Sequence, residues 1–127
     1  MIQKFETKKG ENKYMNCVEF TVGKKTYNLR LNTRNIVQVE KKLGKNPLDV
    51  FTTLEGNSVP KIADLMLILH ASMQQFNHGV KEDDCYDIYD DYLAEGHTLV
   101  DFMNVLLDVF KVSGFVSKDE EGEAKNG

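Results

Sequence analysis

A long apolar helical pattern in the middle of the chain constrains the fold more than any other feature. Between Ser58 and Phe76 apolar residues recur at spacings of three and four, the period of an α-helix: Ile62, Leu65, Met66, Leu69, Met73 and Phe76. Three more apolar side chains lie on its other faces: Leu67, Ile68 and Ala71. Such a helix must be surrounded by protein. We predict that it forms the centre of the core, with Ser58 as its cap and Pro60 in its first turn.

An alternating pattern before this helix predicts a β-hairpin. Residues 17–22 and 26–31 each alternate with period two, and Gly23-Lys24-Lys25 separates them. The inward faces of the two strands are expected to carry Val18, Phe20 and Val22, and Tyr27, Leu29 and Leu31. A two-stranded hairpin is marginally stable alone, so it must pack on the helices that follow.

Capping residues delimit the remaining helices. The first is expected to start at Asn32 or Thr33 and to end at Gly44, with Ile36, Val37 and Leu43 facing inward. A short helix with Pro47 in its first turn follows. Two further helices are predicted over residues 81–93, ending at Gly96, and 99–112, opened by a capping box of Thr98 and Asp101 and closed by Gly114.

These patterns predict a mainly helical α+β fold, an N-terminal β-hairpin packed on a bundle of about four helices. We expect residues 1–16 to be a flexible arm or weak strand, and residues 17–116 to be a single globular domain. Residues 117–127 offer no apolar side chain large enough to bury, and predict a disordered tail.

Basic and acidic residues are unevenly distributed along this 127-residue chain. The formal net charge is only -4, but residues 1–45 hold eleven basic and four acidic residues. Residues 46–127 hold five basic and sixteen acidic residues. The basic candidates for partner binding are Arg34, Lys41 and Lys42 on the first helix. The basic end would bind nucleic acid, or the two ends would pair head to tail with other copies or a charged partner. The remaining alternative is two solvated faces that neutralise each other within the fold.

The helix over residues 81–93 has an acidic outer face. Its candidate residues are Asp83, Asp87, Asp90 and Asp91. Their spacing is helical and no glycine turns the chain between them, which argues against a calcium-binding loop. The face is either a solvated acidic surface or a surface that binds a partner.

The last predicted helix carries more apolar residues than one core face needs. Val100, Val105 and Leu107 lie outside its main apolar face. This helix is therefore either deeply buried or partly a contact surface, and these three residues are candidates for partner binding.

The sequence suggests no catalytic site, metal site or cofactor. Cys17 and Cys85 lack the short spacing of a metal or redox pair, and His70, His78 and His97 do not cluster with them. No apolar run is long enough to cross a bilayer, and no secretory segment opens the chain. We expect a cytoplasmic protein with no membrane partner. A small metal-dependent enzyme that uses Asp87 and Asp91 is a competing hypothesis, which predicts that the protein binds metal in a fixed ratio.

Several segments resemble a known family. They are Leu31–Leu48, Leu67–Ser72, Asp87–Tyr92, Glu95–Thr98 and Phe110–Phe115. Together they look like motifs of the phage tail assembly chaperones of long-tailed phages and prophages of Gram-positive bacteria, over residues 29–115. The resemblance implies a non-enzymatic protein that binds the phage tape-measure protein and helps to recruit tail-tube subunits. It also implies a place in the host bacterial cytoplasm and absence from the mature virion.

The opposed charges would favour self-association along such a client. In this family a programmed frameshift often extends the product, and Ala124-Lys125-Asn126 can be encoded by a slippery sequence. The alternative function is a small nucleic-acid-binding phage regulator that uses the basic N-terminal third.

Overall fold

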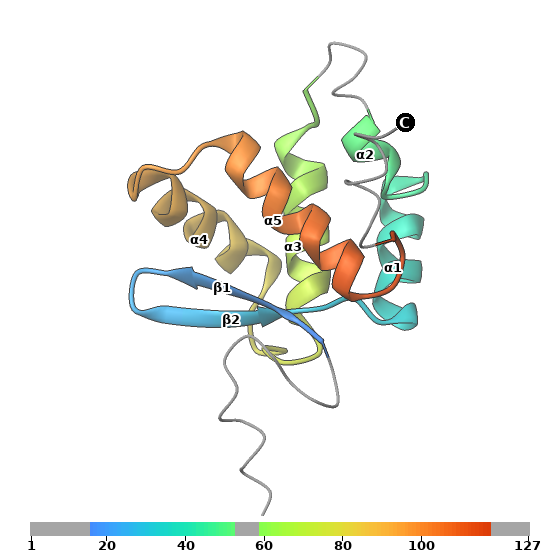
Figure 1. The fold of residues 1–127 in the computed structure, drawn as a ribbon, viewed down its shortest axis with the longest axis horizontal. Helices are drawn as coiled ribbons and strands as arrows, with labels where there is room; N and C mark the ends of the chain where they lie inside the picture. Colours follow the sequence, from blue (N-terminus) through green and yellow to red (C-terminus); the bar gives the residue numbers. More distant parts are fainter. Residues whose placement is uncertain (1–15, 53–58, 118–127) are drawn as a thin grey trace, which may run out of the picture.

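The computed structural model describes residues 16–52 and 59–117. The expected arm before Asn16, the expected cap at Ser58 and nearly all of the expected tail lie outside the described residues. The elements follow the order β1 (Val18–Val22), β2 (Lys25–Leu29), α1 (Thr33–Leu43), α2 (Asp49–Thr52), α3 (Ile62–Met73), α4 (Glu82–Ala94) and α5 (Leu99–Val112). The expected fold class, an N-terminal hairpin on a mainly helical α+β framework, is confirmed (Figure 1).

The hairpin has the expected inward face. β1 and β2 pair antiparallel, with Phe20 opposite Tyr27. Gly23 adopts a φ of 65° at the turn, a conformation that glycine adopts without steric cost. Phe20 and Leu29 are buried. Leu31 is also buried, although it lies just beyond the end of β2.

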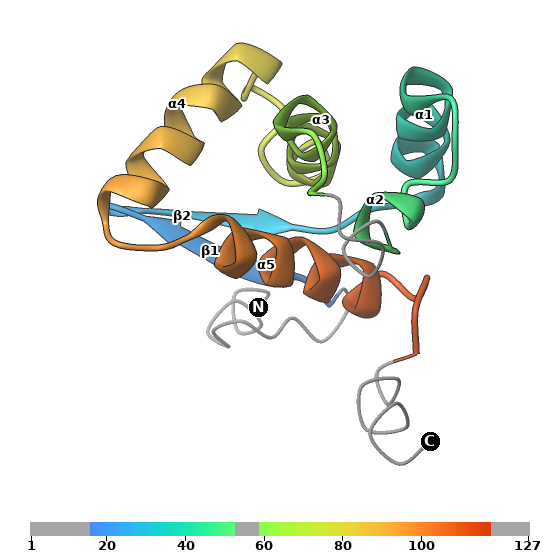
Figure 2. The ribbon, with the colours of Figure 1, turned by 90° about the horizontal axis from the view of Figure 1, so that it is seen from above.

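The elements form two layers. α1, α3 and α4 lie side by side in one layer, with α3 between the other two, and the hairpin and α5 form the second layer (Figure 2). α3 contacts α1, α4, α5 and β2. This central position agrees with the apolar character of α3 on all sides.

The core of the domain is built on α3. Its fully buried side chains are Leu65, Met66, Ile68, Leu69, Ser72 and Met73. The predicted start of this helix was wrong, because Pro60 precedes it and Lys61 occupies the N-cap position with extended backbone. Ile62, expected on the inward face, is the first helical residue and is 43% exposed. Phe76 lies beyond the last helical residue, Met73.

α1 has the expected ends but a different inward face. The Asn32 side chain accepts a hydrogen bond from the backbone N–H of Asn35 (2.8 Å), and Gly44 adopts a left-handed φ of 76°. Val37, expected inward, is 37% exposed, whereas Val39 is only 2% exposed. The buried side of α1 is therefore rotated toward Val39, which packs in the core beside Ile36.

The predicted turn between α4 and α5 is confirmed. Gly96 follows α4 with a φ of 101°. Thr98 Oγ1 then accepts from the Asp101 N–H (3.2 Å), and the Asp101 carboxylate accepts from the Thr98 N–H (2.8 Å). This capping box satisfies two backbone donors at the start of α5.

Arg30 and Leu31, which follow β2, bind the hairpin to the ends of α3 and α5. The Arg30 N–H donates to the carbonyl of Ser72 at the end of α3 (2.9 Å), and the Leu31 N–H donates to the Ser113 hydroxyl after α5 (2.9 Å). The Arg30 guanidinium also donates to the Val112 carbonyl (3.2 Å). These bonds fix the hairpin against the C-terminal ends of α3 and α5.

Two isoleucines of α3 provide a matched test of this core. Ile68→Ala should lower the free energy of unfolding by about 2–5 kcal/mol, because Ile68 is fully buried. Ile62→Ala, on the same helix, should cost less than about 1 kcal/mol. Urea denaturation followed by circular dichroism measures both. Equal losses would contradict the central position of Ile68.

Candidate functional site

The acidic residues predicted as candidates are all exposed on α4. Asp83, Asp87, Asp90 and Asp91 lie on the outside of the helix. The opposite side of α4 packs into the core through Cys85, Ile88, Tyr89 and Tyr92. α4 contains six acidic residues and no basic one, so the charge of its outer face is not balanced along the helix.

The basic candidates are also exposed, on α1. Arg34, Lys41 and Lys42 all face away from the core. Lys41 and Lys42 lie in the last turn, where a positive charge interacts favourably with the helix dipole, whereas Arg34 lies in the first turn, where it does not.

The structure does not bring the two charged sets together. α1 and α4 lie on opposite sides of α3, so their outer faces point away from each other (Figure 2). Not all basic residues follow this division. Lys24 lies at the hairpin tip, where the neighbouring Gly23 N–H donates to the carboxylate of Glu95 after α4.

The extra apolar residues of α5 have different environments. Val105 is half-buried and packs against the core, and Leu107 is half-buried as well. Val100, in the first turn, is 56% exposed. Packing therefore covers part of the apolar excess of α5, and the most exposed of the three candidate residues lies at its N-terminal end.

Two exposed apolar residues were not predicted from the sequence. Val59 is 63% exposed just before α3, and Ile62 is 43% exposed in its first turn. The N-terminal ends of α3 and α5 lie at the same end of the fold (Figure 1). Val59, Ile62 and Val100, which we call the apolar end, are among the most exposed large apolar residues of the described chain. The Val59-Pro60 pair could have indicated that Val59 precedes α3, because a proline favours extended backbone in the residue before it.

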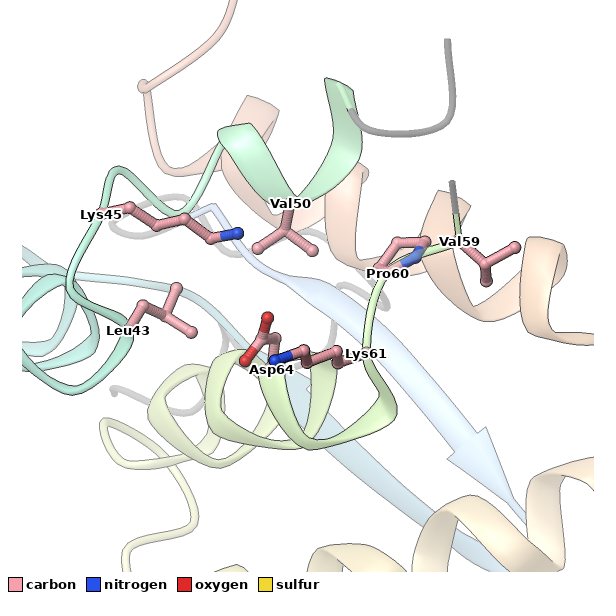
Figure 3. Close-up of a pocket in the computed structure, with 7 residues that line it drawn as sticks. All are labelled: Leu43, Lys45, Val50, Val59, Pro60, Lys61 and Asp64. Atoms are coloured by element: carbon pink, nitrogen blue, oxygen red, sulfur yellow. The ribbon is translucent and has the colours of Figure 1, made fainter. Parts of the chain in front are cut away.

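A pocket of about 290 Å³ adjoins the apolar end. Figure 3 shows Leu43 from the end of α1 and Val50 from α2 facing Lys61 and Asp64 from the start of α3. The full lining is Leu43, Lys45, Val50, Val59, Pro60, Lys61 and Asp64. Its lining combines apolar side chains with three charged residues, Lys45, Lys61 and Asp64.

The histidines make local contacts. The His97 ring stacks on Tyr92, with centroids 4.2 Å apart and planes 11° apart, and its Nδ1 lies 3.9 Å from the Asp101 carboxylate. His78 Nδ1 lies 3.2 Å from the carbonyl of Gln74. Over residues 16–52 and 59–117, no group of three or more His, Cys, Asp or Glu side chains is placed to hold a metal ion.

The two thiols differ in accessibility. Burial raises the pKa of the half-buried Cys17 thiol. Cys85 is fully buried, and this burial, with the nearby Asp84 and Glu82 carboxylates, raises its pKa to about 12. A thiol with so high a pKa is a poor nucleophile at neutral pH.

Comparison with known proteins assigns the chain to a family. Residues 12–127 match the model of DUF6096, a family of unknown function. The chain belongs to the DUF6096 family. No curated protein and no solved structure matches the chain. The DUF6096 match includes every strand and helix described above.

No helix in the described part of this DUF6096 chain has both the length and the apolar character needed to cross a membrane. The longest, α5, has 14 residues, of which Asp101, Asp108 and Lys111 are charged. A membrane-spanning helix needs roughly 20 mostly apolar residues.

Thiol labelling tests the environment of the two cysteines. A disulfide reagent added at pH 8 to the folded Cys17→Ser variant should react with Cys85 at least about 1,000-fold more slowly than with the unfolded chain, because the raised pKa suppresses the thiolate. The Cys85→Ser variant should retain the faster labelling, at Cys17. Fast labelling of Cys85 in the folded protein would contradict its burial.

Proposed function

We propose that this protein is a non-enzymatic phage tail assembly chaperone that binds the tape-measure protein and helps to recruit tail-tube subunits. It would act in the host bacterial cytoplasm and be absent from the mature virion. The resemblance over residues 29–115 supports this proposal. Its segments fall on α1 with both of its caps, on the C-terminal halves of α3 and α4, on the turn between α4 and α5, and on the end of α5.

The observation that carries the proposal is the apolar end. A chaperone for an apolar helical client must expose apolar side chains without unfolding its own core. Val59, Ile62 and Val100 meet this requirement, because they are exposed at the starts of α3 and α5, and both of these helices also supply buried core residues. A client helix would place anchors at spacings of three and four residues against such a surface.

The pocket beside the apolar end adds a chemical preference. Lys45 and Lys61 are exposed residues that line it, whereas Leu43 and Val50 supply an apolar wall. Asp64 also lines the pocket, beside Lys61, so one of the three charges offsets another (Figure 3). A client segment with an acidic residue next to an apolar anchor would therefore fit beside Lys45. Val59 lines the pocket and belongs to the apolar end, so the two surfaces adjoin.

A second candidate function, nucleic-acid binding, is favoured by the exposure of Arg34, Lys41 and Lys42 on α1. Retention on DNA at low salt, lost in Lys41→Glu/Lys42→Glu, would support this alternative. Arg34, Lys41 and Lys42 lie on α1, whereas Val59, Ile62 and Val100 lie at the starts of α3 and α5, so the two functions depend on different residues.

The proposal predicts that a tape-measure protein is encoded next to this chain, and co-expression with that protein tests it. The unchanged chain should keep that protein soluble and co-purify with it. Ile62→Asp and Val100→Asp should each reduce the amount of co-purified client at least about 10-fold, because each places a charge at a contact that the bound client would bury. Both changes introduce an acid in the first turn of a helix, where the dipole favours it, so the fold should be retained.

The matched control is His78→Asp, a change to an exposed residue that follows the C-terminal end of α3, the end opposite Ile62. It should leave the complex unchanged. A client that stays insoluble with the unchanged chain, and forms no complex, would overturn the proposed function. A loss with His78→Asp equal to that with Val100→Asp would remove the apolar end as the binding surface.

A further inference from the structure

The outermost residues of α4 form an acidic stripe. The buried side of α4 is set by Cys85, Ile88, Tyr89 and Tyr92, and a rotation of about 100° per residue places Asp83, Asp87 and Asp90 opposite to them. We call these three residues the acidic stripe. Each is exposed, and none forms an ion pair with another described residue.

The charge of the acidic stripe is unfavourable within a single copy. Asp83 and Asp87 are four residues apart, and Asp87 and Asp90 are three apart, so these like charges repel. Asp90 also lies in the C-terminal half of α4, toward the negative end of the helix dipole, and no basic residue occupies the last turn. A positive partner surface would relieve both effects.

The outermost residues of α1 provide such a surface. The inward residues Ile36, Val39 and Leu43 place Arg34, Val37 and Lys41 on the opposite side of this helix. We call these three residues the basic stripe. All are exposed, and neither Arg34 nor Lys41 forms an ion pair with another described residue.

The two stripes match in length. Arg34 and Lys41 are seven residues apart, as are Asp83 and Asp90. In both helices this spacing is two turns, or about 10 Å along the axis. Two helices that lie side by side can therefore form both opposite-charge pairs at once. The exposed Val37 on α1, and the exposed Tyr86 beside the acidic stripe, add apolar area to the contact.

We infer that the basic stripe on α1 of one copy binds the acidic stripe on α4 of a second copy, so that copies associate head to tail. The stripes lie on opposite sides of α3, so a copy that uses one stripe keeps the other free for the next copy (Figure 2). A contact between two different surfaces of this kind propagates into an open chain or closes into a ring. The association needs no client, so it does not depend on the proposed function.

Reciprocal charge reversal tests this contact on the purified full-length protein. Sedimentation velocity of the unchanged chain should show about a doubling or more of the weight-average mass at about 50 mM salt relative to about 500 mM, because salt screens exposed charge pairs. Arg34→Glu/Lys41→Glu and Asp83→Lys/Asp90→Lys should each remain monomeric at low salt. In each variant the two stripes have the same sign.

An equimolar mixture of the two variants should restore association at low salt, because the reversed α1 of one matches the reversed α4 of the other. Lys24→Glu/Lys25→Glu is the matched control. It changes the net charge as much as the α1 variant does, but at the hairpin tip, and should associate as the unchanged chain does. Circular dichroism of each variant establishes that it is folded.

Three results would overturn the inference. The first is an unchanged chain that stays monomeric at low salt up to about 100 μM, which excludes a dissociation constant at or below about that concentration. The second is association that persists in both reversal variants. The third is a mixture of the two folded variants that stays monomeric. Client binding is measured separately, so a failure of either proposal is distinguishable from a failure of the other.

Discussion

The burial of α3 is the constraint on which the rest of the structure depends. This helix is apolar on nearly every side, and exposing any side to water would cost hydrophobic free energy. α1 and α4 flank it within one layer, and the hairpin and α5 cover it from the other. The two hydrogen bonds of the Arg30–Leu31 backbone then hold the hairpin to the ends of α3 and α5.

The same arrangement separates the charged surfaces. Because α3 occupies the middle of its layer, α1 and α4 each bury one side against the core and present the other to solvent. The basic and acidic surfaces therefore point in opposite directions, which prevents them from neutralising each other within one copy. The hairpin tip is an exception, since it lies against the acidic end of α4 through the Gly23–Glu95 bond.

Local signals predicted most element ends correctly. Asn32, Gly44 and the Thr98–Asp101 box lie where the sequence placed them, because a cap depends on residues within four positions of each other. The start of α3 was predicted less well, since Pro60 is compatible both with a first helical turn and with the extended lead-in that the chain adopts. The preference for Val37 over Val39 failed because both fit a helical pattern, and only the direction of packing against α3 distinguishes them.

The sequence by itself determined the elements, their caps, the apolar character of α3 and the division of charge along the chain. These properties follow from local backbone hydrogen bonding and from the order of polar and apolar residues. Only the tertiary structure decided that Val59, Ile62 and Val100 remain exposed at one end, and that Val105 is covered. It also set the two charged stripes on opposite sides of the molecule. The exposure of a side chain, and the direction in which a helix face points, depend on residues that are distant in sequence. Packing brings those residues together.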